Sequence, residues 1–145
     1  MDYSDHGLLD TQFDRIVFNF PHAGFLYPEN NRSQIMLHRM LVKGFFKSAS
    51  EMLTEGGEVH VTHKTGHPYD DWDIEELAEM SGLECVEEVG FYQFCYPGYE
   101  NKRGDGSRCD RSFNIGSCST FKFKIISASV GAQLQNLSFF DKVLC

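Results

Sequence analysis

The sequence lacks the features that mark membrane, secreted and zinc-cluster proteins. No stretch of its 145 residues is long and apolar enough to span a bilayer. The acidic start MDYSDHGLLD has neither the basic nor the apolar segment of a signal peptide. The five cysteines are odd in number, and no two have the two-residue gap of a zinc knuckle. We therefore expect an intracellular protein in a reducing compartment, with no bound metal.

Basic residues are scarce. The chain has 13 Lys and Arg against 21 Asp and Glu, which gives a formal net charge of −8. This balance argues against indiscriminate binding to nucleic acid, so any RNA contact must come from a local basic patch. The length suits one domain with a real core.

The most informative stretch is Phe13–Gly24, with the sequence FDRIVFNFPHAG. Its continuous apolar run predicts a strand buried on both faces, as in a parallel sheet covered by helices. Pro21 cannot donate to a sheet ladder, so the strand should end near Phe20. Asn19 to His22 then lie at the carboxyl end, where ligands collect in open α/β sheets. On spacing alone, the alternative is a strand end with a satisfied Asn and a turn-forming Pro.

Periodicity predicts the remaining elements. A helix begins near Ser33 and ends at Gly56-Gly57, and a second helix is capped by Asp70 or Asp71 and ends before Gly82. The other predicted segments are strands at Glu58–Lys64, Leu83–Phe91 and Thr120–Ile126, a long loop at Tyr96–Ser117, and an unassigned tail at Ser127–Cys145. The order strand, helix, strand, helix, strand, loop, strand indicates an α/β fold.

Three stretches together resemble one family: FDRIVFNFPHAG, GGEVHVTHKTGHPYDDW and YPGYENKR. It is the family of ribosomal-RNA uridine-N3 methyltransferases that act on large-subunit RNA, with the plant proteins that share this domain. The resemblance covers roughly Phe13 to Ile126. Asn19-Phe20-Pro21-His22 is similar to the Asp/Asn-Pro-Pro-Tyr/Phe motif of amino- and base-methylating enzymes, with Phe20 in place of the first Pro and His22 in place of the aromatic residue.

The resemblance implies the carboxyl-terminal half of a Rossmann-like, doubly wound methyltransferase sheet, mostly parallel with a final antiparallel strand. The implied cofactor is S-adenosylmethionine, with Asn19 and Phe20 at its site. In this family a glycine-rich turn after the first strand holds the cofactor, yet Gly7 is the one glycine before Phe13. We therefore expect residues 1–126 to be a partial methyltransferase domain that lacks the cofactor half and binds the cofactor poorly by itself.

The resemblance also assigns catalytic roles. Uridine N3 carries an imide proton that must be accepted while N3 is aligned with the methyl group. Asn19 is the expected aligner of the target N–H, and Pro21 fixes the direction of the neighbouring carbonyl. His22 stacks on the base or accepts the proton, and its alternative is a turn histidine in solvent.

Substrate RNA contacts are expected from basic and aromatic residues at the same sheet edge. Lys64 ends its strand there and would meet a phosphate or a uridine carbonyl, and its alternative is a solvated lysine. Aromatic and basic residues alternate in the following loop, which suits flipped or single-stranded RNA. These loop residues are Tyr96, Tyr99, Lys102 and Arg103. The alternative is an ordinary surface loop, since acidic residues dilute its charge.

Two other clusters have plain explanations. His60 and His63 point to opposite faces of a strand, so one zinc ion cannot easily take both. The acidic residues between Asp70 and Glu76 suit the dipole of a helix amino terminus better than a metal.

The sequence thus predicts a methyltransferase acting on rRNA in the nucleolus or cytoplasm. The alternative is an inactive remnant that serves as an RNA- or protein-interaction module. In either case strand 13–20 is expected to lie at an exposed edge and to support self-association.

Overall fold

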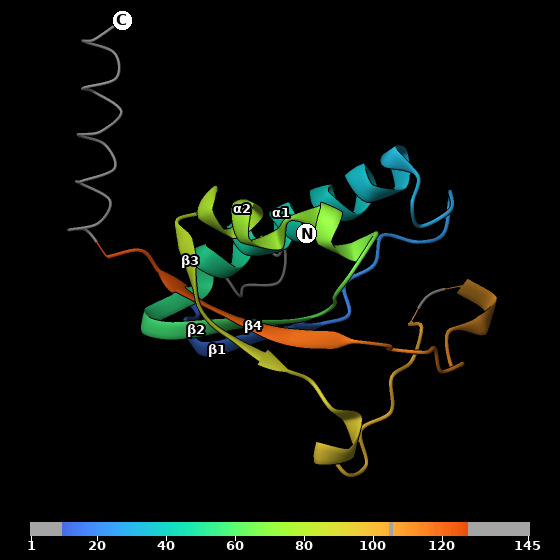
Figure 1. The fold of residues 1–145 in the computed structure, drawn as a ribbon. Coiled ribbons are helices and arrows are strands. Elements are labelled where there is room, and N and C mark those ends of the chain that lie inside the picture. Colours follow the sequence, from blue (N-terminus) through green and yellow to red (C-terminus); the bar gives the residue numbers. More distant parts are fainter. Residues whose placement is uncertain (1–9, 105, 128–145) are drawn as a thin grey trace, which may run out of the picture.

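The computed structural model describes residues 10–104 and 106–127, which form a four-stranded sheet with helices on one face (Figure 1). The strands are β1 (Phe13–Asn19), β2 (Leu53–Lys64), β3 (Leu83–Gly90) and β4 (Cys118–Ile125). The α-helices are α1 (Arg32–Met52) and α2 (Ile74–Glu79). Short 3-10 helices are η3 (Tyr69–Trp72), η4 (Gln93–Cys95) and η5 (Gly106–Arg108).

The strand order is β1-β2-β4-β3. β1 pairs with β2 in parallel, and β4 is antiparallel to both β2 and β3. Three strands therefore run in one direction, and β4, the last of the described strands, lies between β2 and β3. The predicted α/β class, mostly parallel with a final antiparallel strand, is confirmed.

The core lies between α1 and the helix-covered face of the sheet. Phe46 of α1 is fully buried, and its ring lies 4.9 Å from the ring of Phe123 in β4. Phe45 lies 4.8 Å from Phe18 of β1, and so ties the edge strand to the same helix. Alternate residues of β2 complete this layer, with Val59 and Val61 fully buried. Burial of these side chains stabilises the fold by about 1.5 to 3 kcal/mol each.

Helix α1 begins as predicted and ends earlier than predicted. Asn31 caps it, because its Oδ1 accepts hydrogen bonds from the backbone N–H groups of Ser33 and Gln34. The helix ends at Met52, and β2 starts at once with extended backbone at Leu53, so termination at Gly56-Gly57 is wrong. The glycines instead lie where the β1–β2 register shifts, and Gly56 has a φ of 79°.

The second predicted helix starts later than expected. Tyr69–Trp72 form the 3-10 turn η3, and Asp73 caps α2 by accepting from the backbone N–H of Glu76. Asp70 is not a helix cap: its carboxylate accepts from the N–H of Gly66. The inner face of α2 packs on the core, since Ile74, Leu77 and Ala78 are buried.

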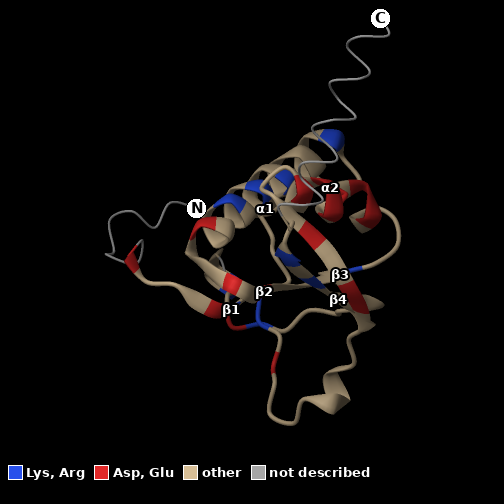
Figure 2. Cartoon of the chain, turned by 90° about the vertical axis from the view of Figure 1, so that its left-hand side faces the viewer, with Lys and Arg blue, Asp and Glu red and all other residues tan. Residues whose placement is uncertain are grey.

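Strand β1 is not buried on both faces, contrary to the prediction. It pairs with β2 alone among the described strands, and Val17 is 52% exposed. Ile16 and Phe18 pack against the core, while no α-helix of the described residues covers the other face of the sheet (Figure 1). The expected edge position of strand 13–20 is confirmed. Figure 2 shows that Asp and Glu residues gather along α2 and β3, at the opposite end of the sheet.

The loop between β3 and β4 extends away from the layers (Figure 1). It holds η4 and η5, and the buried side chain of Asn101 donates to the carbonyl of Phe113 across it. Residues 128–145 of the unassigned tail lie outside the described residues. In the part of the chain described, no helix has the length and apolarity needed to cross a membrane, and Cys85, Cys95, Cys109 and Cys118 are free thiols.

Candidate functional site

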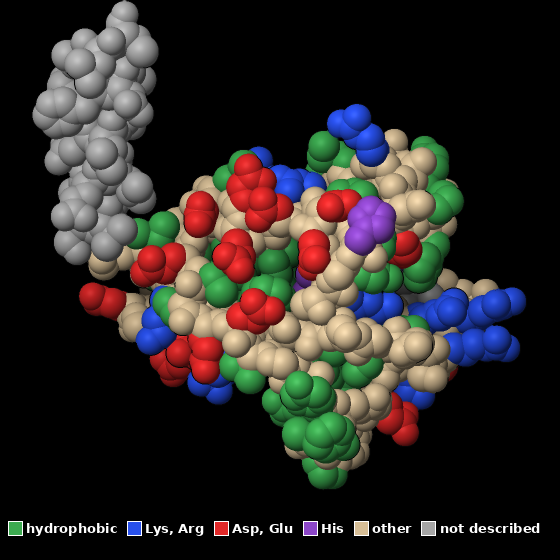
Figure 3. Space-filling model, in the orientation of Figure 1, with side chains coloured by type: hydrophobic (Ala, Val, Ile, Leu, Met, Phe, Trp, Pro, Cys, Tyr) green, Lys and Arg blue, Asp and Glu red, His purple; other side chains and the backbone are tan. Residues whose placement is uncertain are grey.

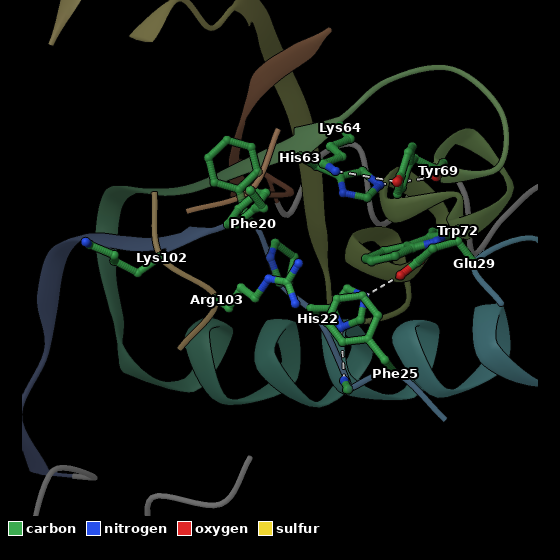
Figure 4. Close-up of a pocket in the computed structure, with 13 residues that line it drawn as sticks. Phe20, His22, Phe25, Glu29, His63, Lys64, Tyr69, Trp72, Lys102 and Arg103 are labelled. Atoms are coloured by element: carbon green, nitrogen blue, oxygen red, sulfur yellow. Dashed lines mark hydrogen bonds and ion pairs between the residues drawn. The ribbon is translucent and has the colours of Figure 1, made fainter. Parts of the chain in front are cut away.

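A cavity of about 270 Å³ opens at the carboxyl ends of β1 and β2. Four segments line it: the loop after β1, the end of β2, η3, and the loop between β3 and β4 (Figure 4). Its lining residues are Phe20, Pro21, His22, Gly24, Phe25, Glu29, His63, Lys64, Tyr69, Trp72, Lys102, Arg103 and Phe113. This edge of the sheet is the one where the sequence predicts the site.

Phe20 turns the chain from β1 into the cavity. It has a φ of 51°, in the left-handed region that few non-glycine residues occupy. Its N–H donates to the carbonyl of Thr62 at 2.7 Å, and its ring contacts Phe91 and Phe113 at 5.8 and 5.5 Å. These contacts stabilise a backbone conformation that costs of order 1–3 kcal/mol at such positions.

The loop after Phe20 is held by polar side chains from the first turns of α1. Gln34 and His38 are both fully buried. Nδ1 of His38 accepts from the N–H of Ala23 at 3.1 Å, and Oε1 of Gln34 accepts from the N–H of Tyr27 at 2.9 Å. The Gln34 amide also donates to the carbonyl of Gly24. The helix therefore determines the path of the loop.

Glu29 joins two histidines beside the cavity. Its Oε1 lies 2.5 Å from Nε2 of His22, and its Oε2 lies 3.2 Å from Nε2 of His38. Burial lowers the pKa of His38, and the nearby His22 lowers it further, while Glu29 raises it.

A stack of rings forms the wall opposite this loop. Trp72 lies between His38 and His63, with ring centroids 4.2 and 4.3 Å away. Burial lowers the pKa of His63 to about 4, so the ring is neutral at pH 7 and donates to the carbonyl of Tyr69. Arg39 of α1 donates to the carbonyl of Trp72 at 2.6 Å and fixes this wall to the helix.

Two positively charged side chains, Lys64 and Arg103, lie at the rim of the cavity. Lys64 lies over the rings of Tyr69 and Phe113, at 5.1 and 5.3 Å from their centroids. Arg103 lies over Phe25 at 5.8 Å, and Figure 4 shows it on the cavity side of that ring. Such contacts leave the charges available to a further group while holding the side chains in place. The arrangement is suited to a planar ligand that carries hydrogen-bond acceptors.

Most predicted site residues meet at this cavity. Phe20, Pro21, His22, Lys64, Lys102 and Arg103 all line it. Tyr96 and Tyr99 do not, and instead pack on Phe91 at 5.1 and 5.8 Å, one ring away from Phe20. Lys102 is paired with Glu100 at 3.1 Å.

Asn19 lies apart from the cavity. It is exposed, and it alternates with Phe18, so its side chain lies on the sheet face that carries no helix. In addition, no glycine-rich turn follows a strand within residues 10–104 and 106–127. The described residues therefore offer neither Asn19 in the cavity nor a glycine-rich turn to S-adenosylmethionine.

Sequence reasoning missed the residues that build the walls. Glu29, Trp72 and Phe113 come from three separate segments, and only the fold brings them together. One signal was available for Trp72: it is the single tryptophan of the chain and lies within the motif GGEVHVTHKTGHPYDDW.

A tight exposed group of aromatic side chains lies outside the cavity. Tyr92, Phe94 and Tyr96 are 58, 81 and 54% exposed, and Figure 3 shows hydrophobic side chains protruding where η4 lies. The same view shows Lys and Arg side chains gathered near the loop that carries η5.

Comparisons with known proteins identify relatives in plants and yeast. A protein of Arabidopsis thaliana named heavy metal-associated isoprenylated plant protein 41 is 55% identical over 113 residues, which cover 78% of this chain and 22% of that protein. An uncharacterized Arabidopsis protein is 47% identical over 82% of this chain and 58% of its own length. A 25S rRNA (uridine-N3)-methyltransferase of Saccharomyces cerevisiae is 27% identical over 69% of this chain and 39% of its length.

The chain therefore spans about a fifth and somewhat over half of the two Arabidopsis relatives. Among solved structures, an S-adenosylmethionine-dependent methyltransferase from Clostridium acetobutylicum overlaps 81% of this chain and 60% of its own, with a TM-score of 0.43 and 14% identity. The family model described as BMT5-like, rRNA (uridine-N3-)-methyltransferase, matches residues 2–103. Since this match spans most of the chain, the protein belongs to the BMT5-like methyltransferase family.

Proposed function

We propose that this chain provides the target-base side of an S-adenosylmethionine-dependent methyltransferase that modifies uridine N3 in ribosomal RNA. The observation that carries the proposal is the cavity, whose walls are aromatic and whose rim is cationic. Family membership supports methyl transfer as the reaction.

The cavity matches the chemistry of a flipped uracil. The base is planar, with two carbonyl oxygens on either side of the N3 proton. Phe25 offers an exposed surface for stacking with the edge of His22 beside it, while Lys64 and Arg103 offer donors to the carbonyls. A cation beside these carbonyls also stabilises the anion that forms when N3 loses its proton, and so increases the fraction of N3 that is deprotonated and able to attack the methyl group.

The proposal assigns residues 1–126 to a partial domain and leaves 127–145 outside it. The half of the domain that holds the cofactor would be supplied by a segment or chain beyond those described. Asn19 would then lie at the junction of the two halves, which suits its exposed position at the end of β1. The proposed place of action is the nucleolus or cytoplasm, where ribosomal RNA is modified.

Base binding and methyl transfer can be tested separately. Fluorescence anisotropy with a labelled single-stranded RNA should show binding by the unaltered chain that depends on uridine in the sequence. Arg103→Ala should weaken binding to the uridine-containing RNA, because Arg103 offers a donor to the uracil carbonyls. Lys43→Ala is the matched control, because Lys43 is exposed on α1 and does not line the cavity.

The outcome also separates the enzyme from the interaction module. Both functions predict RNA binding by this chain, since the cavity is complete without Asn19. Only the enzyme predicts methylation of uridine N3 when the cofactor-binding half of a full-length relative is present. An RNA affinity that ignores uridine and is unchanged by Arg103→Ala would reject the base pocket.

A further inference from the structure

The hydrogen bonds around Glu29 assign it a role that the proposed function does not use. We propose that Glu29 is the positioning residue of the cavity. Its carboxylate holds the His22 ring so that ring carbons, and neither nitrogen lone pair, face the ligand. This inference rests on the proposed base-binding function of the same cavity.

The contacts of His22 determine where its hydrogen lies. Nδ1 is 3.0 Å from the N–H of Gly24, which can only donate, so Nδ1 is the acceptor. A neutral imidazole then carries its hydrogen on Nε2. Nε2 donates to Oε1 of Glu29 at 2.5 Å, so both nitrogens of His22 are engaged within the protein.

His38 is in the same tautomer. The N–H of Ala23 donates to its Nδ1 at 3.1 Å, so its hydrogen also lies on Nε2, facing Oε2 of Glu29 at 3.2 Å. The Gln34 amide nitrogen also lies 3.0 Å from this nitrogen, but the Tyr27 N–H and the Gly24 carbonyl fix it as a donor, so it cannot accept the hydrogen of His38. Two imidazole N–H groups therefore converge on one carboxylate, and each oxygen of Glu29 accepts from one of them.

This arrangement decides between the two roles predicted for His22. Accepting a proton from a base requires a free nitrogen lone pair, and the one lone pair of His22 already accepts from Gly24. The ring instead lies between Phe25 and His38, at 4.1 and 4.3 Å, and borders the cavity. His22 thus presents a fixed ring edge to the cavity beside the exposed ring of Phe25, and Glu29 fixes its orientation.

The same hydrogen positions disfavour a metal ion. His22, Glu29 and His38 offer ligand atoms within 4.8 Å of one another. A histidine that binds a metal through Nε2 uses that lone pair and donates from Nδ1. Here both Nδ1 atoms accept from the backbone, so both Nε2 atoms carry hydrogen.

Nuclear magnetic resonance of the imidazole nitrogens tests the proposal directly in the unaltered chain. Long-range ¹H–¹⁵N spectra at pH 7.5 distinguish a protonated ring nitrogen from an unprotonated one. We expect His22 and His38 both to carry hydrogen on Nε2. A hydrogen on Nδ1 of His22, or shifts of both rings on addition of zinc chloride, would overturn the proposal.

The variant Glu29→Gln tests the role of the carboxylate with little change in shape. An amide has one acceptor oxygen and can serve one imidazole N–H, while its NH₂ group faces the other. One ring must then change tautomer or rotate, and so lose the N–H of Ala23 or Gly24. Glu51→Gln is the control, because Glu51 is exposed on α1. Unchanged His22 and His38 spectra in Glu29→Gln would reject positioning by Glu29.

RNA binding then separates this proposal from the function on which it rests. If the unaltered chain binds uridine-containing RNA, Glu29→Gln should weaken binding about tenfold, the scale of one lost stacking contact, while Glu51→Gln has no effect. Unchanged binding alongside altered tautomers would overturn the positioning role. A chain that binds no RNA but shows the expected tautomers rejects the base-binding function alone, since the tautomers report on Glu29 without a ligand.

Discussion

His63 donates a hydrogen bond from Nε2 to the backbone carbonyl of Tyr69 at 3.2 Å, at the point where β2 passes into η3. The ring is 5% exposed and stays neutral in the folded chain, with a pKa of about 4. In the unfolded chain its pKa returns to the ordinary value of about 6.5.

Stability should therefore fall as the pH falls from 6.5 to 4. In this window the unfolded chain binds a proton at residue 63 and the folded chain does not, so protonation favours unfolding. The loss should reach about 3 kcal/mol, since one pKa unit corresponds to about 1.4 kcal/mol. Urea unfolding at pH 7, 5.5 and 4.5 would measure it. His63→Gln should flatten the curve, while His67→Gln, at an exposed position, should not. Equal slopes in all three proteins would contradict this assignment.

The positive φ of Phe20 predicts that its glycine variant is more stable than its alanine variant, the reverse of the usual order. Phe20→Ala should destabilise the chain by about 2 kcal/mol, because its ring contacts with Phe91 and Phe113 are lost. Phe20→Gly should be more stable than Phe20→Ala by about 1 kcal/mol, since glycine adopts a positive φ without strain. At Phe18, which has regular strand backbone, Phe18→Ala should instead be more stable than Phe18→Gly. Thermal unfolding would show whether the orders differ.

Asn19 gives different expectations for folding and for catalysis. In this chain Asn19→Ala should change the free energy of unfolding by less than about 0.5 kcal/mol, as at most exposed positions. In a complete and active relative, the corresponding change should abolish methylation and leave cofactor binding largely intact, because alignment of the target N–H is lost. Near-normal turnover of that variant would remove Asn19 from the site.

The described residues offer S-adenosylmethionine no glycine-rich turn after a strand. We therefore expect the cofactor to bind this chain weakly or not at all. Titration calorimetry with the isolated chain would measure the affinity. Binding in the low micromolar range would show that other elements of the chain hold the cofactor.

The edge strand β1 should support association between chains. Val17 is 52% exposed on a strand whose outer edge has no described neighbour, whereas the other edge strand, β3, carries Glu84, Glu87 and Glu88. Val17→Lys should shift sedimentation toward the monomer, because an edge charge opposes strand pairing. Val86→Lys, at a similarly exposed residue of β3, is the control. A monomeric unaltered chain with strong exchange protection at Val17 and Phe18 would mean that the edge is already covered.

Local patterns were enough to predict the elements and the edge of the sheet that carries the cavity. Phe45 and Phe46 follow the helical period, and Phe121 and Phe123 alternate with lysines, so local spacing reports their burial. The end of α1 at Met52 was not predictable from the sequence. Gly56-Gly57 suggested a helix stop, but they lie within β2, where its pairing with β1 changes register.

The walls of the cavity depend on contacts between distant segments. Glu29 meets His38 nine residues later in the chain, and Trp72 reaches the same ring from beyond β2. No local pattern encodes these contacts, because each depends on how the loop before α1 and the turn η3 are folded against that helix. The strand-end residues were found because parallel strands bring their carboxyl ends to one edge.

Gln34, His38 and Arg39 of α1 together have a mechanical consequence for the cavity. Gln34 and His38 hold the loop on one side, and Arg39 holds the carbonyl of Trp72 on the other. Both walls are thus attached within two turns of a single helix. A displacement of α1 would therefore carry the loop after β1 and the backbone of Trp72 with it, because both are hydrogen-bonded to the same helix.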